Sequence, residues 1–293
     1  MVVKILNLAK KESLLGYASI IPAFLFIAVF FGIPIVSTIY HSFTKWDGLN
    51  TEWVGIGNYV KIFTNGELWS LLKTNFVFLL SMPGIVLLCL VVTVLLYEEV
   101  TGWKFFRSVY YIPTILSAVV VGFLMKTLFA EHGALSILAD RVGLGSHDWL
   151  GHTTSAFMIL IFCYYWQSLG QGVLILLAGM AAISNEMFEA AKIDGANWGH
   201  RLLRIVIPSL VPSLFYFTFI NITWIFVGLF PLTYSVTGGG PGYSTTPIDF
   251  MIYLKGFQSD GAMGYASALS VLLFLIVLVF TWVQFRVSER FSD

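Results

Sequence analysis

The stretch MFEAAKIDGANWGHRLLRIVIPSLVP, Met187 to Pro212, is the most polar run in the second half of the chain and separates two long apolar segments. A short helix can begin after Ser184 or Asn185, because serine and asparagine are favoured N-cap residues. Gly195 can end that helix, since glycine accepts the left-handed backbone conformation of helix C-termini. A second short helix is expected over Trp198 to Val206. By itself this pattern is typical of an ordinary capped loop between membrane helices, and it names no partner.

The composition outside this stretch indicates a polytopic membrane protein. Of 293 residues, 58% are hydrophobic and only 11% are charged, and the mean hydropathy is +0.85. Soluble domains carry about 25% charged residues. Basic and acidic residues balance at 16 each, so the charge gives no indication of a nucleic-acid partner. Cys89 and Cys163 both fall in apolar spans, where packing residues are expected rather than a disulfide or a metal site.

Six apolar segments approach or exceed the ~20 residues that cross a bilayer, and the sequence therefore predicts an all-α fold of about six transmembrane helices. They run roughly over Leu14–Tyr40, Leu71–Leu96, Val109–Leu128, Ser155–Met180, Pro208–Ser235 and Gly264–Phe285. Prolines at positions 22 and 34 indicate kinks, and Pro83-Gly84 interrupts the second segment. The first segment is longer than a signal-peptide core of about 7–15 residues, so a retained anchor is expected.

The distribution of lysine and arginine favours cytoplasmic termini, because these residues accumulate on the cytoplasmic side. With both termini inside, ten of the 16 basic residues face the cytoplasm: Lys4, Lys10, Lys11, Lys104, Arg107, Lys192, Arg201, Arg204, Arg286 and Arg290. Six face outward: Lys45, Lys61, Lys73, Lys126, Arg141 and Lys255. The loops on that outer side, at 46–70, 130–154 and 236–263, are long enough for small helices but not for separate domains.

A polar stripe crosses the fourth span. Tyr164, Gln167, Ser168 and Gln171 follow at i, i+3, i+4 and i+7, which places them on one helix face. Their distance from the start of the span puts them about 13 to 24 Å into it, near its middle, at ~1.5 Å per residue. Polar side chains in hydrocarbon need partners, so this face is expected to meet either neighbouring helices or a wet cavity.

The fifth span offers a second polar group. Asn221 and Trp224 are three residues apart and can share a face, and Phe226 lies two residues further on. Amides combined with aromatic planes suit a sugar, although large aromatics are also ordinary core or lipid-facing residues. No span carries an acid or a base in its middle, whereas an ion-coupled carrier usually needs one. A neutral solute, such as a sugar or polyol, is therefore expected.

The polar stretch resembles a known motif when it is taken together with residues downstream of it. The matching residues are Glu189-Ala190-Ala191, Asp194-Gly195-Ala196, Ile205-Val206-Ile207-Pro208, Thr237-Gly238-Gly239-Gly240-Pro241-Gly242, Ser244-Thr245, Tyr253, Gly256-Phe257 and Gly264-Tyr265-Ala266-Ser267-Ala268. They resemble the EAA loop and downstream segments of binding-protein-dependent ABC importer permeases, more narrowly those of the maltose and glycerol-3-phosphate type. The resemblance covers roughly Leu71 to Arg286 and implies a MetI-like permease core.

The resemblance implies a role for each polar group. The coupling to an ATPase would involve Glu189, Ala190, Ala191, Asp194, Gly195, Ala196, Arg201, Arg204 and Pro208. The substrate pathway would involve Tyr164, Gln167, Ser168, Gln171, Asn221, Trp224 and Phe226. The glycines from Gly238 to Gly242 are expected to form a backbone turn at the outer mouth rather than a phosphate cradle, because no Lys-Ser/Thr comes after them.

The same resemblance implies partners that this chain lacks. They are a second homologous permease subunit, a pair of ATPase subunits on the cytoplasmic side and an extracytoplasmic sugar-binding protein, all in a bacterial or archaeal inner membrane. The chain itself has no GxxxxGK[ST] motif, so ATP and magnesium are expected in the ATPase, and no cofactor, metal or catalytic residue is expected here.

The expected division is an N-terminal anchor region over 1–70, the permease domain over 71–286 and a tail over 287–293. Two other classes stay open from the sequence. An ion-coupled secondary carrier for a neutral solute would work without an ATPase. An intramembrane enzyme would need paired acids, a metal cluster or a Ser/His couple inside a span, and the sequence presents none.

Overall fold

The computed structural model describes residues 16–17, 19–97, 102–143, 148–259 and 261–289. Six stretches of helix in this part of the chain are long and apolar enough to cross a membrane, which confirms the all-α prediction. They cover Ser19–Ser42, Glu67–Tyr97, Ala118–Arg141, Thr153–Ala181, Trp198–Val227 and Met263–Glu289. The basic N-terminal residues Lys4, Lys10 and Lys11, together with Arg290, lie outside the described residues.

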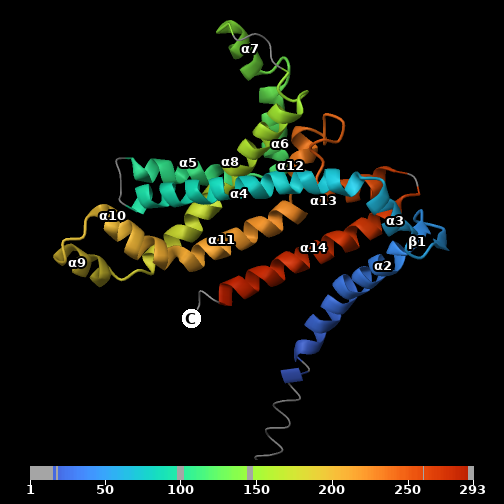
Figure 1. The fold of residues 1–293 in the computed structure, drawn as a ribbon, viewed down its shortest axis with the longest axis horizontal. Helices are drawn as coiled ribbons and strands as arrows, with labels where there is room; N and C mark the ends of the chain where they lie inside the picture. The colour runs from blue at the N-terminus through green and yellow to red at the C-terminus, as the bar shows by residue number, and fades with distance from the viewer. Residues whose placement is uncertain (1–15, 18, 98–101, 144–147, 260, 290–293) are drawn as a thin grey trace, which may run out of the picture. The chain divides into compact units, whose positions relative to one another are not determined.

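The elements succeed one another as Figure 1 labels them. The order is η1 (Ala28–Gly32), α2 (Ile33–Ser42), β1 (Thr44–Trp46), β2 (Thr51–Trp53), α3 (Gly57–Thr64), α4 (Glu67–Tyr97), α5 (Trp103–Ile115), α6 (Ala118–Phe129), α7 (Ala134–Arg141), α8 (Thr153–Ala181), α9 (Asn185–Ile193), α10 (Trp198–Arg201), η2 (Leu202–Val206), α11 (Ile207–Val227), α12 (Phe230–Val236), α13 (Ile248–Tyr253), η3 (Leu254–Gln258) and α14 (Met263–Glu289). The elements named η are π-helical turns.

The chain forms two compact units, each assembled from segments distant in sequence. The smaller comprises Met1–Ile62 and Lys255–Leu272, and the larger comprises Phe63–Leu254 and Leu273–Asp293. In the smaller unit β1 and β2 pair antiparallel, forming a ribbon that was not predicted from the sequence. The buried Asn58 amide holds the start of this ribbon, because its Nδ2 donates to the carbonyl oxygens of Ser42 (2.9 Å) and Thr44 (2.8 Å).

Helix α8 lies in the core of the larger unit. Its buried residues pack with α4, α6, α11 and α12, and both Cys89 and Cys163 are fully buried free thiols in this core, as predicted. Gly172 gives α8 its close approach to α4 and α11, since a Cβ at this position would collide with the Cys89 sulfur and the Phe217 ring. Small residues at such crossings are typical of helix packing in membranes.

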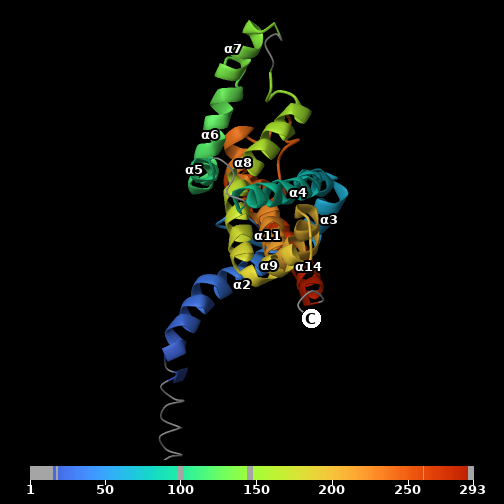
Figure 2. The same cartoon turned by 90° about the vertical axis from the view of Figure 1, so that its left-hand side faces the viewer.

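The third predicted span, Val109–Leu128, is wrong as a single helix. The chain forms α5 up to Ile115, breaks at Leu116 and Ser117, and turns sharply into α6 (Figure 2). Ser117 has an extended backbone, and its hydroxyl accepts from the Val120 amide (3.3 Å), which starts a new helix. The membrane-length stretch accordingly begins at Ala118 and continues through α7. Pro113, near the start of the predicted span, lies inside α5 without ending it.

The fifth predicted span, Pro208–Ser235, is also wrong at both ends. The observed span ends at Val227, and Gly228 and Leu229 separate α11 from α12. The observed span also begins earlier, at Trp198, because α10 and η2 continue into α11. The break at residues 228–229 is supported from two other elements. Asn75 of α4 donates through Nδ2 to the Ile225 carbonyl (2.7 Å) and accepts from the Ile248 amide (3.2 Å).

Asp249 supports the other side of the same break. Its Oδ2 accepts from the backbone amide of Phe230 (2.8 Å), the first residue of α12, and its Oδ1 accepts from the Phe250 amide (3.0 Å). A carboxylate is favoured at a helix N-terminus, where free amides and the helix dipole are positive. Burial nevertheless raises the pKa of Asp249 to about 7, against the lowering effect of these backbone hydrogen bonds.

We expect Asn75→Ala to destabilise the protein more than a matched truncation on the lipid side of the same helix. The substitution leaves the Ile225 carbonyl and the Ile248 amide without their partner, at a cost of about 1–3 kcal/mol for each buried group. Leu80→Ala is the control, because Leu80 is 80% exposed. Thermal unfolding of the purified variants in the same detergent measures the effect, and equal midpoints would contradict this role of Asn75.

We expect Asp249→Asn to change how stability depends on pH. The folded-state pKa of about 7 lies above the ordinary value of 3.8, so the folded state binds more protons between these values. The wild-type free energy of unfolding therefore falls as pH rises from about 4 to about 7 relative to the asparagine variant, which does not titrate. Melting temperatures of both proteins across this range test the prediction, and a difference independent of pH would refute it.

Candidate functional site: the α9–α10 connection and the polar face of α8

The connection between α8 and α11 begins as the sequence predicts. Ser184 occupies the N-cap position of α9 with an extended backbone, although its side chain makes no capping hydrogen bond. Glu186 lies in the first turn, where negative charge is favoured, and Lys192 lies in the last turn. None of the residues of α9 is buried, so the helix stands on the surface of its unit (Figure 1).

Gly195 makes the turn between the two short helices. Its φ is +74°, a left-handed conformation that L-residues other than glycine rarely adopt, and nothing lies within 4 Å of the place where a Cβ would be. The amide of Ala196 then donates to the carbonyl of Ala191 (2.9 Å), a bond typical of a glycine-terminated helix. Asn197 starts α10, since its Oδ1 accepts from the His200 amide (2.9 Å).

The second short helix does not end before the membrane span. Trp198–Arg201 passes through the π turn Leu202–Val206 into α11, and the whole stretch Trp198–Val227 is 30 residues long. Pro208 lies in the first turn of α11, directly after the π turn, and does not end the helix. The connection is therefore attached to α11 by a continuous helix rather than by a loop.

The structure brings the predicted coupling residues together on this connection. Six of these residues are exposed: Glu189, Ala190, Asp194, Gly195, Arg204 and Pro208. Three are half-buried: Ala191, Ala196 and Arg201. The small residues Ala190 and Ala191 leave the middle of α9 open to close approach by another surface. That this surface belongs to an ATPase stays a prediction.

The polar stripe of α8 runs from the core of the protein to its surface. Tyr164 is fully buried, Gln167 and Ser168 are half-buried, and Gln171 is exposed. Gln167 connects α8 to the break after α5. Its side-chain Nε2 donates to the Leu116 carbonyl (3.1 Å), and its backbone carbonyl accepts from the Thr114 hydroxyl (3.0 Å). The Gln167 Oε1 atom is buried without a hydrogen-bond partner among the described residues. The middle of the stripe thus has a structural role and one free acceptor.

The two predicted polar groups meet in the core. The Tyr164 hydroxyl donates to Asn221 Oδ1 (2.7 Å), and the Tyr164 ring stacks on Trp224 with centroids 5.3 Å apart and planes at 11°. Asn221 also donates to the Phe217 carbonyl (2.8 Å). Phe226, by contrast, is fully buried and packs against Phe280 of α14, with ring centroids 5.0 Å apart. Tyr164, Asn221 and Trp224 form one cluster, and Phe226 belongs to a different contact.

Gln284 of α14 is a polar residue that the sequence-based predictions missed. Both of its side-chain polar atoms are buried without partners in the described part of the chain, and the residue lines a cavity of about 450 Å³ with α11 residues such as Tyr216 and Thr218. The signal in the sequence was the amide itself, a single glutamine within an apolar span just before Arg286. An unsatisfied amide inside a membrane segment is expected to face a partner or a polar ligand.

The glycines after α12 form the predicted backbone turn. Gly238, Gly239 and Gly242 all have positive φ, and threonine hydroxyls close the turn from within. Thr245 donates to the Gly240 carbonyl (2.7 Å), and Thr246 donates to the Gly239 carbonyl (3.1 Å). A Cβ on Gly239 would collide with the Thr246 side chain. The glycines thus serve the tight fold of this segment.

Comparison with known proteins accounts for this arrangement. Residues 54–293 match the family model described as binding-protein-dependent transport system inner membrane component. The chain belongs to this family. It is 30% identical to the multiple sugar-binding transport system permease protein MsmF of Streptococcus mutans, over 94% of this chain and 96% of that protein. It is also 30% identical to the trehalose/maltose transport system permease protein MalF of Thermococcus litoralis, over 98% of each.

A further relative in the family is named for a different solute. The sn-glycerol-3-phosphate transport system permease protein UgpA of Agrobacterium fabrum is 29% identical over 95% of this chain and 96% of its own. Among solved structures, a bacterial ABC transporter involved in import of the acidic polysaccharide alginate has a chain that superposes with a TM-score of 0.82 at 23% identity. That match covers 98% of this chain and 100% of the other, and it establishes the MetI-like permease fold.

We expect Gln171→Ala and Gln167→Ala to separate transport from stability. Gln171 is exposed, so its loss should reduce solute uptake while leaving the melting temperature unchanged. Gln167→Ala should reduce both, because the half-buried Leu116 carbonyl loses its donor at a cost of about 1 kcal/mol. Met158→Ala, at a 65% exposed position on the same helix, is the control. Normal uptake by the Gln171 variant would remove the exposed end of the stripe from the pathway.

Proposed function

We propose that this chain is one of two permease subunits of an ATP-driven importer for a neutral sugar or polyol, and that the α9–α10 connection transmits the motion of the ATPase. The family itself supplies the first part, a membrane component of a binding-protein-dependent transport system. Relatives named for sugar, trehalose and maltose transport support a carbohydrate as substrate. The observation that carries the coupling role is the exposed α9, joined through Gly195 to a helix continuous with α11.

The proposed partners act on both sides of the membrane. An ATPase pair on the cytoplasmic side would bind the exposed face of α9, with Glu189 as the polar anchor and Ala190 and Ala191 as the surface of close approach. ATP and magnesium belong to that pair in this proposal, and this chain performs no catalysis. A second permease subunit completes the pathway, and an extracytoplasmic binding protein delivers the solute. Both termini and the connection are then cytoplasmic, in line with the bias of lysine and arginine.

The neutral charge of the solute is argued from the membrane spans. Helices α8 and α11, which carry the polar stripe and the Tyr164 cluster, contain no acid and no base, and the hydrogen-bonded groups of the cluster are an amide and a hydroxyl. A phosphorylated or acidic solute would need a compensating cation along its path. The exposed amide of Gln171 suits sugar hydroxyl groups, whereas Tyr164, Asn221 and Trp224 contact one another in the core. This favours a neutral carbohydrate over glycerol 3-phosphate.

A secondary carrier would differ from this importer in its source of energy. Uptake by an ATP-driven importer should stop when ATP is depleted and should persist when the proton gradient is dissipated. In vesicles that hold the chain without companion subunits, no solute should accumulate against a gradient. Accumulation under that condition would select the ion-coupled carrier instead.

We expect Gly195→Asp to leave the protein in the membrane while detaching or uncoupling the ATPase. The site has space for a side chain, but its φ of +74° disfavours a residue with a Cβ by about 1 kcal/mol, and the substitution adds a charge to the exposed turn after α9. The measurement is co-purification of the ATPase with the tagged permease, together with uptake. Gly66→Asp is the matched control, because Gly66 also has positive φ (+68°) and free space but precedes α4. A fully active, co-purifying ATPase with the Gly195 variant would refute the coupling role.

A further inference from the structure

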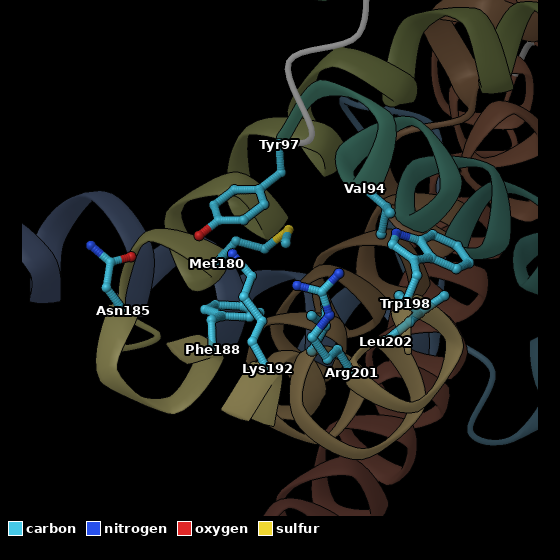
Figure 3. A pocket seen from close by; sticks show the side chains of 10 residues that line it. Val94, Tyr97, Met180, Asn185, Phe188, Lys192, Trp198, Arg201 and Leu202 are labelled. Carbon is cyan, nitrogen blue, oxygen red and sulfur yellow. The ribbon is translucent and has the colours of Figure 1, made fainter. Parts of the chain in front are cut away.

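A cavity of about 470 Å³ lies behind the α9–α10 connection, among the ends of α4 and α8, α9 and the start of the long helix that becomes α11 (Figure 3). Its inner part is apolar and tightly packed, since Val94, Met180 and Val206 are 7%, 1% and 6% exposed. Its outer part is polar and aromatic, and includes the half-exposed Trp198. The cavity therefore has an apolar floor and a polar mouth.

Among the residues that the structure describes, two cations line this cavity and no acid does. Lys192 of α9 and Arg201 of α10 both extend into it in Figure 3, and in the sequence they come before and after Gly195. Neither forms an ion pair with a residue inside the described ranges. The Nε atom of Arg201 is also buried there without a hydrogen-bond partner. Buried donors are almost always bonded, and an unbonded one in an arginine indicates a missing anionic acceptor.

The geometry favours a phosphate group as that acceptor. A guanidinium offers Nε and a terminal nitrogen as two parallel donors, which match two oxygens of one phosphate. Lysine adds a compact charge that can reach a third oxygen. The polar atoms of Asn185 and Tyr97, which also line the cavity, can bond the remaining oxygens or a neighbouring hydroxyl.

We propose that this cavity binds the phosphate of an anionic phospholipid, such as phosphatidylglycerol, from the cytoplasmic leaflet. The inference rests on the proposed function, because only a cytoplasmic α9–α10 connection places Tyr97 and Trp198 at the inner membrane surface. A free phosphate has no apolar group that could pack against the apolar floor, whereas the glycerol backbone and first acyl carbons of a lipid can be buried there. Basic pockets between transmembrane helices on the cytoplasmic side bind anionic headgroups in this manner. The bound lipid would hold α9 and α10 against the ends of α4 and α8.

The test measures lipid retention by the full-length chain, independently of ATPase or transport. The protein is purified into phosphatidylcholine nanodiscs with or without phosphatidylglycerol, and bound lipid is counted by native mass spectrometry after release. The wild type should retain phosphatidylglycerol in preference to phosphatidylcholine. Arg201→Gln and Lys192→Gln should each weaken this retention by about tenfold, the usual effect of losing a charge-assisted hydrogen bond. Two single variants keep the test valid if one of them fails to fold.

Arg204→Gln is the matched control, because Arg204 is exposed and does not line the cavity. It should retain lipid like the wild type, and an equal loss in this variant would show a general charge effect and overturn the site. Displacement of the lipid by inorganic phosphate or glycerol phosphate would assign the cavity to a soluble phosphate instead. Glu98 and Glu99, the two residues after Tyr97, lie outside the described residues. Lipid binding that appears only after both are changed to glutamine would overturn the proposal in favour of an internal carboxylate.

Discussion

The constraint on which the structure depends is that a backbone group released from a helix inside a membrane must find a partner within the protein. Two helices, α5 and α11, end where the chain turns into another helix, and at each of these points a third helix supplies an amide. Gln167 of α8 donates to Leu116 at the end of α5, and Asn75 of α4 donates to Ile225 at the end of α11. These amides therefore fix the positions of the breaks, and the breaks in turn set the course of α6 and α12.

This constraint changes the meaning of the polar residues in the spans. A glutamine or asparagine in hydrocarbon can serve the fold, the solute or both, and the sequence does not distinguish these roles. The Nε2 atom of Gln167 stabilises the fold by donating to the Leu116 carbonyl, whereas its buried Oε1 atom has no hydrogen-bond partner in the described chain. Tyr164 and Asn221 satisfy each other across two helices, with the Trp224 ring stacked beside them. Exposure therefore increases along the polar stripe, from the buried, structural Tyr164 to the exposed Gln171.

The parts of the fold that depend on local sequence could be predicted, and the parts that depend on contacts between distant residues could not. Apolar runs of sufficient length identified the membrane spans, and Ser184 with Gly195 identified both ends of α9. Proline was a poor guide to the breaks, because Pro83, Pro113 and Pro212 all lie inside helices. The real breaks at residues 116–117 and 228–229 become favourable only when partners from α8, α4 and α13 are in place. Phe226 and Gln284 illustrate the same limit, since only the packing of α11 with α14 decides whether each is covered.

The continuity of α10, η2 and α11 has a mechanical consequence. Thirty residues of unbroken helix extend about 45 Å at ~1.5 Å per residue, and a helix of this length is stiff. A force applied at Trp198 is therefore transmitted along the helix axis to the region of Asn221 and Trp224, and from there to the break at Gly228. The π turn at Leu202–Val206 is where the hydrogen-bond ladder changes register. Together with Pro208 and Pro212, which follow it, this turn is where the helix can bend, and such bending would limit how much of a displacement reaches the middle of the membrane.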